Sequence, residues 1–243
     1  MSSVELSLIL PCYNEGPTFE KSVWQVVSIL KKIKRNWEII FVEDKSTDET
    51  KKTIAKLLGQ MKNSRAIFHE KNEGRGKSVV DGILASRGEI CGFIDVDLEV
   101  SADYISLFIK EIENGYDMAI ARRFYEISLS SIVRALFSKV YLLIVQILLG
   151  IPLRDTEAGY KFFRRLKVLQ IAKRSKNRGW FWDTEICFLA LKNNLRISEV
   201  PVIFKRRKDK ESTVRLIPDT IDYMRNLIRF KSQTGNKLKI SKL

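Results

Sequence analysis

The chain has 243 residues, which suits one large domain or two small ones, and its apolar content of 45% is ordinary for a globular protein. Lys and Arg number 43 against 29 Asp and Glu, so the net charge of +14 indicates an anionic partner: nucleic acid, an acidic membrane surface or a phosphorylated substrate. The alternative is a soluble enzyme from a proteome that is rich in lysine. The cysteines Cys12, Cys91 and Cys187 match no metal-binding spacing, and the single histidine, His69, disfavours a histidine-based triad or a zinc site.

The sequence has no segment with the pattern of a signal peptide or a membrane span. The N-terminal MSSVELSLILPCYNE lacks a basic region, and its apolar run is short. In the most apolar segment the longest unbroken run covers 140–145, whereas a spanning helix needs about 20 such residues. Any attachment to a membrane is therefore expected at its surface.

Strands and helices alternate through the first half of the chain. Apolar runs predict the following strands: 6–11, 37–44, 64–71, 89–97 and 116–123. Helical periodicity predicts four helices, at 18–33, 46–61, 76–86 and 102–115. Thr18 is expected to cap the first helix, and the second has acids in its first turn. Strands separated by helices of this length form right-handed βαβ units. We therefore expect an α/β fold whose mainly parallel sheet binds ligands beyond the carboxyl ends of its strands.

The second half has a different pattern. An amphipathic helix is predicted near 128–149, and Arg134 and Ser138 interrupt its apolar face. Three further elements are predicted: a polar loop at 154–165, a helix at 181–193 and a strand at 196–204. From there the chain carries twelve Lys and Arg against four Asp and Glu. We therefore expect one domain over 1–204, which includes the amphipathic helix, and a basic C-terminal loop and extension over 205–243.

Three carboxylates gather where the predicted strand at 89–97 ends. Asp95, Asp97 and Glu99 alternate along the chain directly after an apolar run. Carboxylates this close repel one another unless a cation neutralises them. Mg²⁺ takes such oxygen ligands and completes its shell with substrate phosphates and water. We expect these acids to hold Mg²⁺ or Mn²⁺ against a diphosphate; the alternative is a solvated rim of turn residues.

The segment NEGRGKS at 72–78 precedes a predicted helix and suggests a P-loop. That motif fails because it requires glycine where Lys71 stands. The GxGxxG motif also fails, since Val79 stands in place of its last glycine. What remains is a Gly-rich, basic loop at a helix N-terminus, which either binds an anion or is a simple turn.

The order of motifs along the chain is more specific than any single motif. LILPCYNE, FVEDKSTDET, NEGRGKSVVDGI and DVDLE are followed by RDTEAGYKFFRR, FWDTE and EVPVIFKRR. Over residues 4–215 this order resembles the family 2 glycosyltransferases of GT-A fold. Within that family it is similar to the dolichyl-phosphate mannose synthases and the dolichyl-phosphate glucosyltransferases, and GWFWDTEI is closer to the glucosyltransferase pattern.

The resemblance implies roles for individual residues. The matches to the nucleotide-sugar site are Pro11, Tyr13, Glu15, Asp44, Lys77, Asp95 and Arg207. The matches to the metal site are Asp95, Asp97 and Glu99, and those to catalytic residues are Asp97 and Arg123. The matches to the acceptor-phosphate site are Arg134, Ser138 and Ser212. The chain departs from the family pattern at Glu43, Lys45, Ala121, Arg122 and Lys210.

The implied reaction is the inverting transfer of a hexose, mannose or glucose, from a nucleotide-diphosphate sugar to dolichyl or polyprenyl phosphate, with Mg²⁺ or Mn²⁺ as cofactor. A phosphate monoester is largely ionised near neutral pH, so this acceptor needs cations to position it rather than a general base. Because polyprenyl chains lie in the bilayer, we expect a peripheral enzyme at the cytoplasmic face, bound through the amphipathic helix and the basic tail. The alternative is that this helix packs into the core or onto a partner subunit.

Two other functions suit parts of the sequence. A sugar or protein hydroxyl acceptor would require a general base, for which Asp155, Asp183 and Glu185 are the candidates. Charge alone would suit a nucleic-acid-binding protein, but the chain has no recognition helix or RNP-type aromatic motif, so we expect no nucleic-acid partner. The protein partners considered are a second copy of the chain and a small membrane-anchoring subunit.

Overall fold

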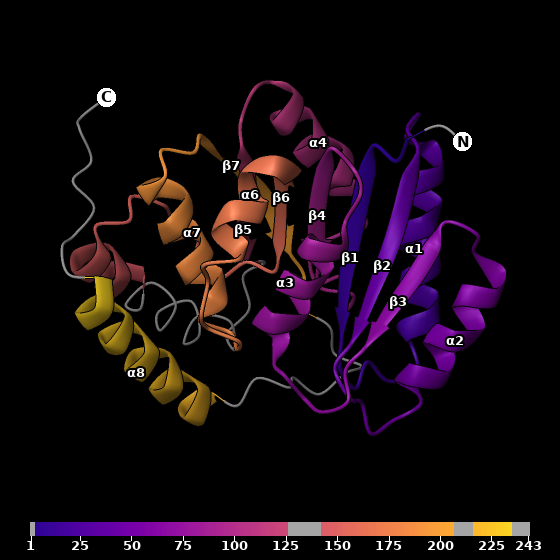
Figure 1. Ribbon diagram of the computed structural model, residues 1–243, viewed down its shortest axis with the longest axis horizontal. Helices are drawn as coiled ribbons and strands as arrows, with labels where there is room; N and C mark the ends of the chain where they lie inside the picture. Colours follow the sequence, from indigo (N-terminus) through magenta and orange to yellow (C-terminus); the bar gives the residue numbers. More distant parts are fainter. Residues whose placement is uncertain (1–2, 126–141, 207–215, 235–243) are drawn as a thin grey trace.

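The computed structural model describes residues 3–125, 142–206 and 216–234, which contain a seven-stranded sheet (Figure 1). The strands are β1 (Leu6–Cys12), β2 (Trp37–Glu43), β3 (Ser64–Phe68), β4 (Ile90–Ile94), β5 (Met118–Tyr125), β6 (Tyr160–Arg164) and β7 (Ile197–Phe204). Their order in the sheet is β3-β2-β1-β4-β6-β5-β7. All neighbouring strands are parallel except β6, which runs antiparallel to β4 and β5. The mainly parallel α/β fold expected from the sequence is confirmed.

Helices cover both faces of the sheet. They are α1 (Phe19–Lys32), α2 (Thr50–Gln60), α3 (Arg75–Ala85), α4 (Ile105–Glu113), α6 (Arg165–Ala172), α7 (Trp182–Lys192) and α8 (Leu216–Thr234). Residues 142–149 are also helical, and a 3₁₀ turn precedes α4. In β1, Leu8 and Leu10 pack with α1, α2 and α4, whereas Ile9 packs with α3 and α7 on the other face. Because both faces are buried, the strands are nearly continuous apolar runs.

The segment predicted as a polar loop at 154–165 instead contains β6, a strand in the middle of the sheet. Its residues 160–163 are all buried, although one of them is Lys161. Phe162 packs with the α1 side of the sheet and Phe163 with the α3 side. The prediction was wrong because lysine and arginine mask the apolar pattern. The helix α6, which follows directly, was not predicted.

One predicted helix cap and one predicted helix start differ from the structure. Thr18 precedes α1, but its side chain makes no capping hydrogen bond. Helix α2 begins at Thr50, four residues later than predicted, so no acid lies in its first turn. Asp48 instead accepts hydrogen bonds from the backbone N–H groups of Thr50 (2.9 Å) and Gly16 (3.0 Å). This carboxylate joins the loop after β1 to the start of α2.

Helical residues 142–149 pack against the same core cluster as α7 and α8. Val145 and Leu149 are fully buried in this cluster, whereas Leu143 and Ile147 are exposed on another side of the helix. The core-packing alternative therefore holds for this described part of the amphipathic helix. Among the described residues, no helix is both long enough and apolar enough to cross a membrane.

Helix α8 lies against α7, away from the strands β1–β3 (Figure 1). The Phe230 ring packs edge-on against Phe181 and Phe188, with centroids 5.5 and 5.1 Å away. The Tyr223 hydroxyl donates a hydrogen bond to the backbone oxygen of Trp180 (2.7 Å). This helix belongs to the region predicted as the basic extension, and its packing connects that region to the loop before α7.

Candidate active site

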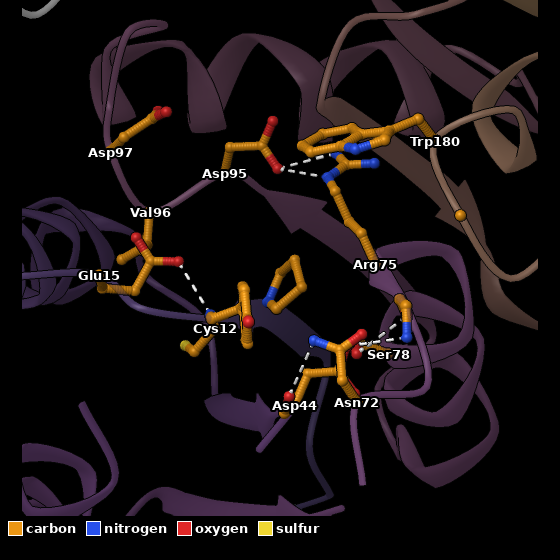
Figure 2. A pocket seen from close by; sticks show the side chains of 14 residues that line it. Cys12, Glu15, Asp44, Asn72, Arg75, Ser78, Asp95, Val96, Asp97 and Trp180 are labelled. Carbon is orange, nitrogen blue, oxygen red and sulfur yellow. Dashed lines mark hydrogen bonds and ion pairs between the residues drawn. The ribbon is translucent and has the colours of Figure 1, made fainter. Parts of the chain in front are cut away.

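A cavity of about 390 Å³ lies at the carboxyl ends of β1, β2 and β4, where the sequence predicted the ligand site (Figure 2). It is lined by the last residues of β1, by residues that follow β1, β2 and β4, by the N-terminus of α3 and by the loop before α7. The lining residues are Pro11, Cys12, Tyr13, Glu15, Asp44, Asn72, Gly74, Arg75, Ser78, Asp95, Val96, Asp97, Gly179 and Trp180. Open α/β sheets place ligands at this edge.

Six predicted site residues line this cavity: Pro11, Tyr13, Glu15, Asp44, Asp95 and Asp97. The Glu15 carboxylate accepts a hydrogen bond from the backbone N–H of Tyr13 (3.1 Å). The backbone N–H of Glu15 donates to the hydroxyl of Thr50 (2.8 Å). These bonds fix the turn after β1, so the exposed Tyr13 ring is presented at the edge of the cavity.

Asp44 holds the start of α3 in place. Its carboxylate accepts hydrogen bonds from the backbone N–H groups of Glu73 (2.7 Å) and Gly74 (2.8 Å), and the His69 Nδ1 lies 2.7 Å from its Oδ1. The following residue, Lys45, has φ = 61°, a left-handed conformation that favours glycine, and it is one of the positions at which the chain departs from the family pattern.

The three predicted metal-binding acids are not equivalent. Asp95 and Asp97 line the cavity, whereas Glu99 does not. The Asp97 carboxylate accepts a hydrogen bond from the Glu99 backbone N–H (3.1 Å). Among the described residues, no three His, Cys, Asp or Glu side chains form a group that could hold a metal ion. Two carboxylates at a cavity still suit Mg²⁺ or Mn²⁺, because such ions use one or two carboxylates and take further ligands from substrate phosphates.

Arg75 is the main site residue that the sequence did not identify. Its Nε and Nη2 donate to Asp95 Oδ1 (3.0 and 2.7 Å), and its Nη1 donates to Asp183 Oδ2 (2.5 Å). Its guanidinium carbon lies 5.0 Å from the centre of the Trp180 ring. Figure 2 shows this ring beside the Arg75 guanidinium. Burial acts to lower the pKa of Arg75, but Asp183 and Asp95 outweigh this effect and raise it. Arg75 lies in the segment NEGRGKS, and its partners Trp180 and Asp183 lie in GWFWDTEI, so the motifs contained these residues without indicating that they meet.

Burial raises the pKa of the Asp95 carboxyl; Arg75 opposes this shift, and Asp97 adds to it. Gly159 lies directly against Asp95, since its backbone oxygen accepts a hydrogen bond from the Asp95 N–H (2.9 Å). Any Cβ at Gly159 would stand 1.7 Å from Asp95 Oδ2. The glycine is therefore required for this arrangement of the acid.

A second ion-paired group forms around Arg123, the predicted catalytic arginine. Its Nε and Nη2 donate to the two carboxylate oxygens of Asp155 (2.7 and 2.9 Å), and Glu157 lies 3.7 Å away. Burial acts to raise the pKa of Asp155, but Arg123 outweighs it and lowers that pKa. Burial raises the pKa of Glu157 to about 7, with Arg123 opposing the shift. None of these three residues lines the cavity around Asp95.

The remaining predicted site residues lie elsewhere. The Lys77 ammonium is 2.5 Å from both carboxylate oxygens of Asp81, one helical turn along α3, and it does not line the cavity. Four predicted residues fall outside the described part of the chain: Arg134, Ser138, Arg207 and Ser212.

An α/β sheet with Asp95 and Asp97 at its carboxyl edge is the arrangement expected for a glycosyltransferase of GT-A fold. The profile of Glycosyl transferase family 2 matches residues 7–171, well over half of the chain. The chain belongs to this family. The resemblance inferred from the order of motifs is thereby confirmed, and the nucleic-acid-binding alternative is set aside.

Individual proteins agree with this assignment. Glycosyltransferase AglD of Haloferax volcanii is 27% identical over 237 residues, which cover 96% of this chain and 36% of AglD. Dolichyl-phosphate beta-glucosyltransferase of Saccharomyces cerevisiae is 27% identical over 245 residues, which cover 92% of this chain and 73% of the yeast protein. The chain therefore spans about a third of the first relative and three quarters of the second.

Solved structures share the fold. Glucosyl-3-phosphoglycerate synthase from Mycobacterium tuberculosis, crystallised with Mn²⁺, uridine diphosphate and phosphoglyceric acid, superimposes with a TM-score of 0.70 at 19% identity. The match covers 97% of this chain and 80% of the synthase. At this identity the likeness establishes the fold alone.

Proposed function

We propose that this chain transfers a hexose, with glucose favoured, from a nucleotide-diphosphate sugar to dolichyl or polyprenyl phosphate. Family membership supports the reaction class, and the name of the yeast relative supports both glucose and the dolichyl-phosphate acceptor. Mannose, the other hexose expected from the sequence, has no support among the names of these relatives.

The observation that carries the proposal is the state of the three candidate bases for a hydroxyl acceptor. Asp155 is paired with Arg123, and Asp183 is paired with both Arg75 and Lys161. Glu185 accepts hydrogen bonds from two backbone N–H groups, at 2.9 and 2.8 Å. None of the three lines the cavity. A phosphate acceptor needs no base, because its oxygen is already ionised near neutral pH.

The donor is proposed to occupy the cavity described above. The nucleotide would lie against the turn after β1, where Pro11, Tyr13 and Glu15 meet Asp44. Its diphosphate would face Asp95. The proposed transfer inverts the configuration of the sugar by one direct displacement, so it forms no covalent intermediate with the protein. The Arg75 guanidinium adds preorganised positive charge at the place where the leaving diphosphate develops its negative charge.

Asp95 and Asp97 are the residues proposed to hold Mg²⁺ or Mn²⁺. The fit rests on two carboxylates that line one cavity beside room for phosphate oxygens. When bound there, the ion supplies Lewis-acid neutralisation of the leaving diphosphate. Glu99 is proposed to act less directly, since its backbone N–H orients the Asp97 carboxylate.

The acceptor phosphate is proposed to meet Arg134, Ser138 and Ser212, and the nucleotide sugar to meet Arg207; all four residues lie outside the described part of the chain. Exposed apolar residues on two helices of the described part of the chain support binding to a membrane surface. Leu143 and Ile147, one helical turn apart, are 56% and 55% exposed, and exposed apolar residues also occur on α8 at Ile221 and Ile228. Apolar residues on a basic protein suit the surface of an anionic bilayer. We propose that the protein binds the cytoplasmic face of the membrane. The proposed protein partners are a second copy of the chain and a small anchoring subunit.

The experiment that tests the function separates donor from acceptor. Purified protein is given radiolabelled UDP-glucose, GDP-mannose or UDP-N-acetylglucosamine with dolichyl phosphate or with a sugar acceptor. We expect transfer of glucose to chloroform-soluble lipid. Transfer to the sugar hydroxyl, with none to lipid phosphate, would refute the proposed acceptor.

A further inference from the structure

Arg75 occupies a position between two acids of different kinds. Its contact with Asp183 is at the buried end, where Asp183 is only 1% exposed. Its contact with Asp95 is at the cavity end, where the acid is 37% exposed. The arginine itself is 12% exposed. One partner is therefore fixed within the protein, and the other faces the space that a ligand would enter.

The buried end is stable without Asp95. Asp183 is also bound by the ammonium of Lys161, a fully buried residue that donates a second hydrogen bond to the backbone oxygen of Ala158 (2.6 Å). The Arg75 guanidinium additionally lies against the rings of Phe93 (5.4 Å) and Trp180 (5.0 Å). These contacts would keep the arginine in place if its hydrogen bonds to Asp95 were given up.

The cavity end places two cations in competition. Arg75 directs two N–H groups at Asp95 Oδ1, while Asp95 Oδ2 lies against Gly159. A divalent ion on Asp95 would stand beside the positive guanidinium, and like charges this close repel one another. The repulsion is relieved when an anion enters between them. A diphosphate is such an anion, and arginine binds phosphate with the same planar fork of N–H groups that it uses for carboxylates.

We propose that Arg75 is the resident counter-ion of Asp95 and that it couples metal binding to nucleotide binding. When the nucleotide diphosphate enters, Arg75 transfers its hydrogen bonds from Asp95 to the diphosphate, and Asp95 becomes available to the metal. The metal binds weakly to the protein alone and tightly in the presence of the nucleotide. This inference rests on the proposed function, since it assumes the donor and metal sites given above.

The test measures binding without catalysis. Free Mn²⁺ is followed by electron paramagnetic resonance with and without UDP, and UDP binding is followed by calorimetry with and without Mn²⁺. In the unaltered protein, we expect each ligand to strengthen the binding of the other by the same factor, as linkage requires. The expected factor is about ten- to a hundredfold, the range for a charge-assisted hydrogen bond.

Arg75→Gln should shift the two ligands in opposite directions. Mn²⁺ alone should bind more tightly, because Asp95 has lost its competing cation, whereas UDP alone should bind more weakly. Arg75→Lys keeps the charge but loses the planar fork, so its coupling should be intermediate. Arg65→Gln is the matched control, because Arg65 is also paired with a buried acid, Glu38, at the opposite end of the sheet. It should bind both ligands as the unaltered protein does.

The outcomes separate the inference from the proposed function. If Arg75→Gln weakens Mn²⁺ and UDP together, the arginine only supports the structure of the site, and the inference is wrong. If the unaltered protein binds both ligands independently, the inference fails while the donor site stands. If it binds neither, the proposed function fails as well. If Arg75→Gln is unfolded in thermal melts, Arg75→Lys becomes the deciding variant. Undiminished coupling between Mn²⁺ and UDP in Arg75→Lys would show that the planar guanidinium is not what couples them, and the inference would be wrong.

Discussion

A single methyl group at Gly159 should disable the site while leaving the fold in place. An alanine Cβ there would stand 1.7 Å from Asp95 Oδ2 and 2.6 Å from Arg75 Nη2. Real Cβ atoms essentially never approach other heavy atoms this closely, so both side chains must move. The Gly159 backbone is not in a left-handed conformation, so Gly159→Ala acts through space rather than through backbone strain.

The size of the effect follows from what can move. The Asp95 backbone is fixed by its hydrogen bond to the Gly159 oxygen, so the carboxylate must rotate away from the added methyl group, and the Arg75 guanidinium must move as well. Overpacking of this kind costs about 1–3 kcal/mol of stability. Misplacement of a site residue by about 1 Å can lower the rate by about 100-fold. The fall in kcat/KM should therefore be much larger than the fall that the loss of stability alone would produce.

The assay combines kcat/KM for UDP-glucose and dolichyl phosphate with urea unfolding of the same preparation. Gly59→Ala is the matched control, because Gly59 lies in α2 and a methyl group added there would meet no heavy atom within 4 Å. That change should leave activity intact and stabilise the helix by up to about 1 kcal/mol. An unchanged kcat/KM in Gly159→Ala would refute the reasoning, since Asp95 and Arg75 would then tolerate displacement.

Three further predictions concern the metal, the pH dependence and the membrane. Asp97→Ala should abolish transfer without lowering the unfolding midpoint, and excess EDTA should do the same to the unaltered protein; full activity in EDTA would contradict a metal role. The pKa of Glu157 is raised from 4.5 to about 7 in the folded protein. Between these two pH values the folded state therefore binds more protons than the unfolded state. The free energy of unfolding should fall by up to about 1.4 kcal/mol per pH unit as the pH rises through this range. Urea titrations across this range should show the fall, and a slope that persists in Glu157→Gln would assign it to another group. Leu143→Ser with Ile147→Ser should reduce the salt-resistant part of flotation with anionic vesicles, because apolar burial is not screened by salt; equal flotation would place the lipid contact elsewhere.

Much of the fold could be predicted because parallel strands covered on both faces have a plain sequence pattern. The strand before Asp95 is a continuous apolar run, and the strand before Asp44 is apolar at 39–42; a helix with clear periodicity separates each from the next strand. The carboxyl ends of such strands meet at one edge of the sheet. The positions of Pro11, Asp44 and Asp95 around one cavity therefore followed from their places in the sequence.

The parts that could not be predicted depend on contacts between distant segments. Arg75 meets Asp183, which is 108 positions away, and no local pattern records that meeting. The strand β6 was missed because Lys161 interrupts its apolar run, and a lysine is rarely buried unless it is paired. Its partner, Asp183, comes from α7. The sequence contains both residues, but only the fold brings their charges together.

The buried charges are better explained by the positions they impose than by any stability they provide. Lys161, Asp183, Arg75 and Asp95 alternate in sign from the centre of the sheet to the cavity. Taking such ions out of water costs free energy that their attraction only partly returns, and apolar replacements of a buried pair are often as stable. A sheet that needed only stability would have an apolar residue at position 161. Because each charge in this series fixes the next, the lysine in the middle of the sheet determines where Asp183 holds Arg75. Arg75 in turn determines the orientation of Asp95 at the cavity, and this first acid after β4 is tolerated there because the arginine from α3 neutralises it.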